Sequence, residues 1–132
     1  MSSDEINLVE KMFAAFANKD VAEAISTVSD DTVWIHHGTQ KLPSMRFVGK
    51  KGVKQFFEIN FSSMHVDYFR VNRLMQSGNT VIAFGEEKFR MDGRDGEMAQ
   101  KWVQVYTIEN GFITRMEEFA TSVDDKDYGV VD

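Results

Sequence analysis

Three short turn signals divide the second half of the chain into four runs of similar length. The triplet Ser-Gly-Asn at residues 77–79, the stretch Asp-Gly-Arg-Asp-Gly at 92–96 and the pair Asn-Gly at 110–111 interrupt runs rich in β-branched and aromatic residues. Asn-Gly favours a two-residue hairpin because both residues tolerate positive φ. The pattern therefore predicts four consecutive antiparallel strands, near residues 65–76, 80–91, 97–108 and 112–121.

Two helices are predicted near the N-terminus. Ser2 and Glu5 form a capping-box pattern ahead of apolar residues at helical spacing, which predicts a first helix of about four turns. Asp20 and Glu23 repeat the start signal and open a shorter second helix. The two segments together predict a helix hairpin.

A single strand separates this hairpin from a third helix. Residues 32–37, Thr-Val-Trp-Ile-His-His, have strand character, and the loop at 39–48 holds Pro43, the only proline of the chain. Beside a pocket, such a loop is a candidate lid. The third helix starts at residues 49–52, Gly-Lys-Lys-Gly, and continues with an apolar face.

This order of elements predicts an α+β fold in which three N-terminal helices cover a curved, mostly antiparallel sheet. The 132 residues are expected to form one domain, with a core at about residues 4–121 and an acidic, partly ordered tail at 122–132.

Composition narrows the function classes. A net charge of -6 works against attraction to nucleic acid phosphates, and no apolar run suits a signal peptide or a membrane span. The absence of cysteine excludes disulfides and thiolate chemistry. A cytoplasmic location is expected, with no nucleic-acid partner and no membrane partner.

Four short stretches carry a resemblance to a known group of proteins. They are residues 20–25 (Asp-Val-Ala-Glu-Ala-Ile), residues 30–34 (Asp-Asp-Thr-Val-Trp), Gly49 with Val53, Phe56 and Phe57, and residues 109–113 (Glu-Asn-Gly-Phe-Ile). With them the chain resembles the nuclear transport factor 2-like superfamily and its SnoaL-like and ketosteroid isomerase-like branch, over roughly residues 4–121. The resemblance implies a cone-shaped barrel of the cystatin-like type, an apolar cavity between helices and sheet, and a homodimer formed through the other sheet face.

The same resemblance argues against the best-known reactions of the branch. Matching motif by motif, the isomerase's base falls on Ile35, its oxyanion-hole acid on Val103, its tyrosine near Met12 and its supporting tyrosine on Phe57. Apolar side chains replace all four polar groups, so that isomerase mechanism is not expected. The aspartate that often ends the cyclases' last strand falls on Thr121, which cannot act as an acid or base at ordinary pH.

Strand alternation, combined with these matched positions, sorts the two faces of the sheet. His37 and Glu118 become the candidate catalytic acid-base pair, with a solvated rim carboxylate and a packing histidine as the alternatives. Glu87 is chosen over Glu86 as a further cavity residue, and Asp67 is a weaker alternative. The predicted ligand-binding residues are Met12, Phe16, Ile35, Phe56, Phe57, Glu87, Val103, Val105, Met116 and Ala120.

The opposite face combines large aromatic residues with few lysines, which is typical of a protein interface. We therefore expect a homodimer through Trp34, His36, Trp102, Gln104, Tyr106 and Phe119, beside Arg115 and Glu117. An alternative exchanges the two faces. It places Trp34, His36, Trp102 and Tyr106 in the cavity as an aromatic ligand cage.

No cofactor or metal site is expected. His36 and His37 are adjacent on a strand, so they point to opposite faces and cannot chelate one ion together. The first functional hypothesis is a SnoaL-like protein that binds a small hydrophobic, oxygenated molecule and acts on it by acid-base chemistry, as an isomerase, cyclase or dehydratase. The alternative is a non-catalytic ligand-binding or protein-interaction module of the same fold.

Overall fold

The computed structural model describes residues 3–131 and contains the predicted helices and strands. Ser3 caps the first helix by accepting a hydrogen bond from the Ile6 amide at 3.0 Å, whereas Ser2, the predicted cap, lies outside the described residues. The elements are α1 (Asp4–Ala17), α2 (Val21–Ile25), β1 (Val28–His36), β2 (Met45–Val48), α3 (Gly49–Ser63), β3 (Met64–Ser77), β4 (Thr80–Met91), β5 (Met98–Glu109), β6 (Phe112–Ser122) and a short 3-10 turn (Asp125–Asp127).

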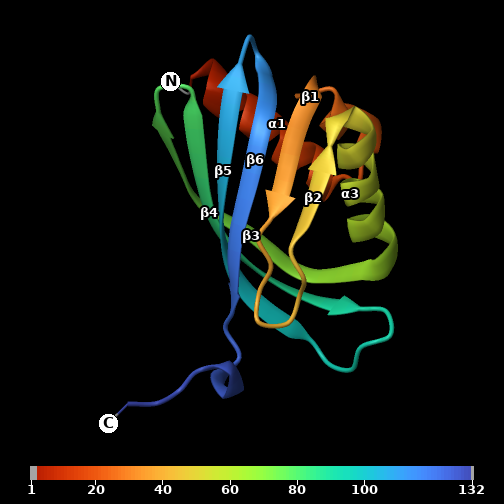
Figure 1. Ribbon diagram of the computed structural model, residues 1–132, viewed down its shortest axis with the longest axis vertical. Helices are drawn as coiled ribbons and strands as arrows, with labels where there is room; N and C mark the ends of the chain where they lie inside the picture. Colours follow the sequence, from red (N-terminus) through yellow and green to blue (C-terminus); the bar gives the residue numbers. More distant parts are fainter. Residues whose placement is uncertain (1–2, 132) are drawn as a thin grey trace.

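The strands form one curved sheet in the order β2-β1-β6-β5-β4-β3. β1 runs parallel to β6, and the other neighbouring pairs are antiparallel. In Figure 1 the helix α1 lies behind the sheet, and the long strands of the meander sweep round below α3. The predicted α+β, cone-shaped fold with helices on one sheet face is confirmed.

Two boundaries in the first half differ from the sequence prediction. β1 begins at Val28 rather than Thr32, with a register irregularity between Val28 and Val33. The buried Thr32 hydroxyl donates to the Ile113 carbonyl at 2.9 Å, which ties the irregular part to β6. The predicted loop at 39–48 is shorter, because its end forms the strand β2 beside β1. Pairing between distant residues produces both differences.

The largest aromatic rings of the sheet face the helices. Trp34, only 1% exposed, packs with its ring centroid 5.4 Å from Phe56 and 5.6 Å from Phe57 of α3. Trp102 stacks on Phe13 of α1 at 6.0 Å. Burial of rings of this size is a main source of stability. This face is therefore the core side of the sheet, as in the exchanged-face alternative.

Gly85 makes room for the Trp102 indole. The two residues are register partners on β4 and β5. A Cβ atom at position 85 would lie 2.0 Å from Cζ2 of Trp102, well inside van der Waals contact. A residue without a side chain is therefore required beneath this indole.

No helix within residues 3–131 is long and apolar enough to cross a membrane.

Candidate functional site

A cavity of about 210 Å³ lies between the helices and the core side of the sheet. This is far more than the roughly 15 Å³ that one water molecule needs, and it suits a small organic ligand. Its helical wall is apolar apart from Asn60 of α3, and it includes Met12, Phe16, Phe56 and Phe57. These four residues were predicted to contact ligand, and they do line the cavity.

The sheet forms a polar wall opposite the helices. This wall carries one imidazole and two carboxyl groups, those of His36, Glu87 and Glu118. In the part of the chain that the structure describes, no lysine or arginine lines the cavity. The site is therefore suited to uncharged ligands more than to anions, which would meet two carboxyl groups without a cation.

His36 is held by hydrogen bonds at both ring nitrogens. Its Nε2 lies 2.7 Å from Oε2 of Glu118, its register partner on the parallel strand β6. Its Nδ1 accepts the Gly38 amide hydrogen at 3.0 Å, so in the neutral imidazole Nε2 carries the proton and donates to the carboxylate. Burial opposes protonation, but the hydrogen bond and charge of Glu118, with the charge of Glu87, outweigh it and raise the pKa of His36.

Glu118 likewise has a hydrogen-bond partner at each of its two carboxylate oxygens. Its second oxygen accepts a hydrogen bond from the amide of Gln104, its neighbour on β5, and the carbonyl oxygen of Gln104 accepts from the Tyr106 hydroxyl. Burial, with the nearby charge of Glu118, raises the pKa of Tyr106 well above its usual value, so this hydroxyl is a neutral donor. The chain from Tyr106 to His36 is thus internally satisfied.

Glu87 differs because one of its oxygens is free. Gln100, opposite it on β5, donates to Oε1, whereas no donor from residues 3–131 is within hydrogen-bonding distance of Oε2. Only 8% of Glu87 is exposed. Burial, and then the charge of Glu118, raises the pKa of Glu87 to about 7. At neutral pH this carboxyl group can therefore both give and take a proton.

Four of the predicted cavity residues lie on the wrong face. His37, Ile35, Val103 and Val105 are absent from the cavity lining. His37 instead lies near Glu117, at 3.1 Å, with its ring stacked on Phe119 at 4.5 Å. Alternation along each strand holds, but the matched family positions turned the wrong face of β1 and β5 toward the helices, whereas the predicted inward faces of β4 and β6 are correct.

The remaining cavity predictions divide. Glu87 and Glu118 line the cavity as predicted. Met116 is buried in the core and Ala120 packs against that core, and neither lines the cavity. His37 and Glu118 do not form the predicted acid-base pair. His37 pairs with Glu117, and the partner of Glu118 is His36.

The predicted homodimer face is wrong in most of its members. Trp34, His36, Gln104 and Tyr106 line the cavity, and Trp102 is buried in the core. Of the six named interface residues only Phe119 is exposed, at 49%. Arg115 and Glu117, predicted beside them, also stay outside the cavity, where they pair with each other. The exchanged-face alternative describes Trp34, His36 and Tyr106 correctly, whereas Trp102 does not reach the cavity.

Sequence reasoning missed Gln100 and misplaced Gln104, the two amides that hold the carboxyl groups. A signal was present. Residues 100, 102, 104 and 106 read Gln, Trp, Gln and Tyr at strand spacing, so two amides alternate with two large aromatic residues on one face. Buried amides at such positions need polar partners, and the two glutamates provide them.

The chain belongs to the SnoaL-like domain family, whose model matches residues 9–116. It therefore lies within the nuclear transport factor 2-like superfamily. No curated protein sequence matches it.

Solved structures with the same fold share little sequence with this chain. A nuclear transport factor 2-like protein of Burkholderia xenovorans is 18% identical, with 91% of each chain covered and a TM-score of 0.80. TerC, co-crystallised with polyporic acid, is 23% identical, with 89% of this chain and 91% of the other covered and a TM-score of 0.71. An epoxide hydrolase of the LEH-like type from M. tuberculosis is 15% identical, with 90% and 82% covered and a TM-score of 0.68. At these identities the likeness establishes the fold.

Proposed function

We propose that this SnoaL-like protein binds a small, hydrophobic, oxygenated molecule in its cavity and acts on it by acid-base chemistry, with Glu87 transferring the proton. The observation that carries the proposal is the free carboxyl oxygen of Glu87 on the wall of an aromatic cavity, with a pKa of about 7. A carboxyl group of this kind can protonate a carbonyl or hydroxyl oxygen, and its ionised form can remove a proton from carbon.

Isomerisation, cyclisation and dehydration each need such a proton transfer. Glu118 has a supporting role in this scheme, because both of its oxygens already accept hydrogen bonds. Its negative charge helps to keep Glu87 protonated near neutral pH. Glu87 thus transfers the proton, and Glu118 supplies the negative charge that raises the pKa of Glu87.

Two of the similar structures support the ligand class. TerC was crystallised with polyporic acid, and the M. tuberculosis protein is an epoxide hydrolase, so cavities of this fold accept oxygenated organic molecules.

The adjacent glutamates give a matched test of the Glu87 role. Neutral aromatic and terpenoid carbonyl compounds are first screened by thermal shift, since a ligand that binds only the folded state raises the apparent stability. Compounds that bind are then assayed for turnover. Glu87→Gln is expected to lower kcat at least about 100-fold, because it cannot exchange a proton. Glu86 lies on the outer face, where its carboxylate accepts a hydrogen bond from the Tyr68 hydroxyl. Glu86→Gln is therefore expected to keep the parental kcat.

Turnover by Glu87→Gln at the parental rate would remove Glu87 from the mechanism. Binding without any conversion by the parent protein would instead favour the second candidate, a non-catalytic ligand-binding module. That candidate is supported by the internal pairing of His36 and Glu118, which leaves one carboxyl group available for chemistry.

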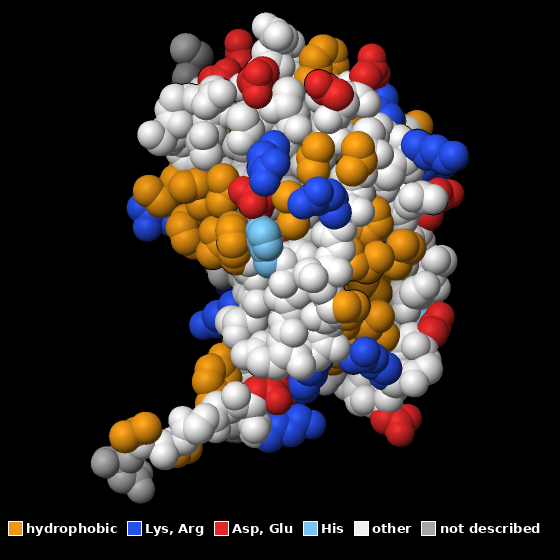
Figure 2. All heavy atoms as spheres, viewed as in Figure 1, with side chains coloured by type: hydrophobic (Ala, Val, Ile, Leu, Met, Phe, Trp, Pro, Cys, Tyr) orange, Lys and Arg blue, Asp and Glu red, His pale blue; other side chains and the backbone are white. Residues whose placement is uncertain are grey.

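The homodimer is proposed through the outer sheet face, with a corrected set of residues centred on Phe119 and His37. Figure 2 shows hydrophobic side chains gathered on this face near a histidine. Phe119→Asp is expected to convert a dimer into a monomer in light-scattering measurements, because a charge is placed in an apolar contact. Phe112→Asp, an exposed phenylalanine at the start of β6, is the matched control and should leave the dimer intact. A monomeric parent, or a dimeric Phe119→Asp variant, would contradict the proposal.

A further inference from the structure

The loop between β1 and β2 forms part of the cavity wall. Leu42 and Pro43 from this loop line the cavity. The Thr39 amide donates to the Leu42 carbonyl at 2.9 Å, and the Thr39 hydroxyl accepts from the amides of Lys41 and Leu42 at 3.1 and 3.0 Å. The loop is therefore a compact turn with its own internal hydrogen bonds.

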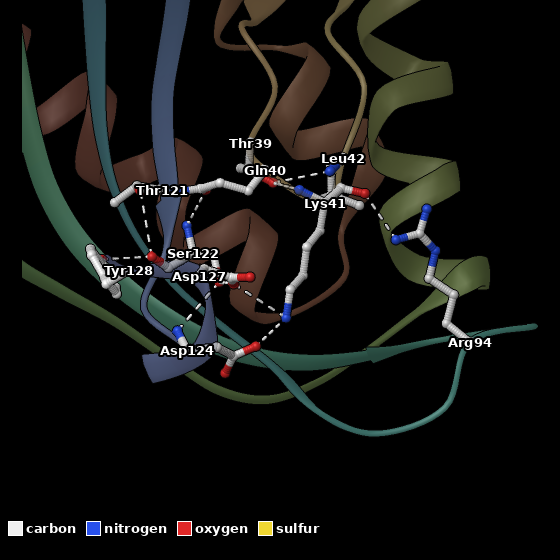
Figure 3. Close-up of polar contacts among 10 residues, drawn as sticks. All are labelled: Thr39, Gln40, Lys41, Leu42, Arg94, Thr121, Ser122, Asp124, Asp127 and Tyr128. Carbon is white, nitrogen blue, oxygen red and sulfur yellow. Dashed lines mark hydrogen bonds and ion pairs between the residues drawn. The ribbon is translucent and has the colours of Figure 1, made fainter. Parts of the chain in front are cut away.

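Side chains, rather than sheet pairing, hold the tip of this turn. The last sheet-like hydrogen bond before it runs from the His37 amide to the Glu118 carbonyl at 3.0 Å. Beyond that point, the Gln40 side chain donates to the Thr121 hydroxyl at 2.9 Å and accepts from the Ser122 amide at 2.8 Å. Figure 3 shows these contacts between the turn and the end of β6.

Lys41 adds a charged contact to the segment after β6. Its ammonium group pairs with Asp124, and Asp127 lies 3.5 Å away. All three side chains are partly buried. The Ser122 hydroxyl donates to Asp127, and this bond together with the Lys41 charge lowers the pKa of Asp127. The contact is therefore charged over the whole neutral range.

Two further contacts fix the ends of this arrangement. The Tyr128 hydroxyl donates to the Ser122 carbonyl at 2.7 Å, which folds the C-terminal segment back on β6. Arg94, from the turn between β4 and β5, donates to the Lys41 carbonyl at 2.9 Å. Three segments far apart in sequence thus meet at the turn of residues 39–42 (Figure 3).

We propose that Thr121, Ser122, Asp124, Asp127 and Tyr128 form a latch on this turn, and that its release lets Leu42 and Pro43 swing away from the cavity. Each contact alone is weak, as partly exposed ion pairs and side-chain hydrogen bonds are, so the turn can open without unfolding the sheet. The latch rests on the proposed role of the cavity as the ligand site. It adds control over how fast a ligand enters and leaves.

The test uses the full chain and needs no substrate. Lys41→Ala and the double variant Asp124→Asn with Asp127→Asn each remove the ion pairs from one side. Lys50→Ala is the matched control. Lys50, at the start of α3, pairs with Asp30 of β1 at 3.8 Å, away from the turn. Amide hydrogen exchange is measured by NMR at Leu42 and Ser122, and at the centre of β5. Tryptophan quenching by acrylamide, a small neutral molecule, is measured in a Trp102→Phe background, so that it reports access to Trp34 in the cavity wall.

Both latch variants are expected to speed exchange at Leu42 and Ser122 roughly tenfold, since charged hydrogen bonds are lost. They should also increase quenching while the β5 amides stay at the parental rate. Exchange at Leu42 and Ser122 within twofold of the parent would overturn the latch. Equal acceleration at β5, or the same behaviour in Lys50→Ala, would also overturn it by showing a global loss of stability. A failure of Glu87 in turnover assays would leave this outcome unaffected.

Discussion

Replacing Glu87 with glutamine is expected to stabilise the protein by about 3 kcal/mol at pH 8 and to change little at pH 4. An unfolded glutamate ionises near 4.5, whereas in the folded protein the pKa of Glu87 is about 7. Between these values the folded protein keeps a proton that the unfolded chain has lost. The free energy of unfolding therefore falls as pH rises from 4.5 to 7, and glutamine removes this loss while it can keep the contact with Gln100.

Denaturant unfolding at several pH values measures this effect. The curves of the parent and of Glu87→Gln should diverge steadily between pH 5 and 8. Glu86→Gln serves as the control, since Glu86 lies on the outer face, and its curve should run parallel to that of the parent. Parallel curves for Glu87→Gln as well would show that Glu87 ionises normally, and the proposed proton transfer at neutral pH would lose its basis.

Replacing His36 with alanine is expected to cost about 3 kcal/mol near pH 6, because it breaks a buried pair and leaves Glu118 with Gln104 as its remaining partner. The raised pKa of His36 sets the pH window. Its stabilisation is complete below pH 6.5 and declines as pH rises through the folded pKa. The penalty should therefore be smaller at pH 9.

His65→Ala is the matched control, since His65 also pairs with a carboxylate, that of Asp92, but at the protein surface. His65 is half exposed and lies 2.9 Å from Asp92, so its loss should cost under about 0.5 kcal/mol. Urea midpoints at pH 6 and 9 compare the two variants. Similar midpoints for both would mean that the His36 and Glu118 pair contributes little to the folded state.

Local chemistry made the meander predictable from sequence. The predicted strands agree with β3 to β6 within one residue at each end, because the turns between them depend on local residues. Asn110 and Gly111, for example, both adopt positive φ. The strand β2 could not be foreseen in the same way, since it exists only by pairing with β1.

The faces of the sheet were the main error, and the reason is physical. Alternation shows which residues share a face, but it does not show which face the helices cover. Matching family positions placed Ile35 and Val103 inside, whereas Trp34 and Tyr106 are the buried ones. The larger apolar area of the two rings was the better guide, because the core side of a sheet gains most from burying large side chains.

The position of β6 has a consequence for the order in which the molecule can be built. β6 is the last strand along the chain, yet it lies between β1 and β5 and joins the two parts of the sheet. While the chain is being synthesised, β1 and β2 have no neighbour to connect them to β3, β4 and β5 until residues 112–122 emerge. Contacts at such long sequence separation slow folding. The pair of His36 and Glu118 is therefore among the last contacts to form, since Glu118 must emerge before His36 has its partner.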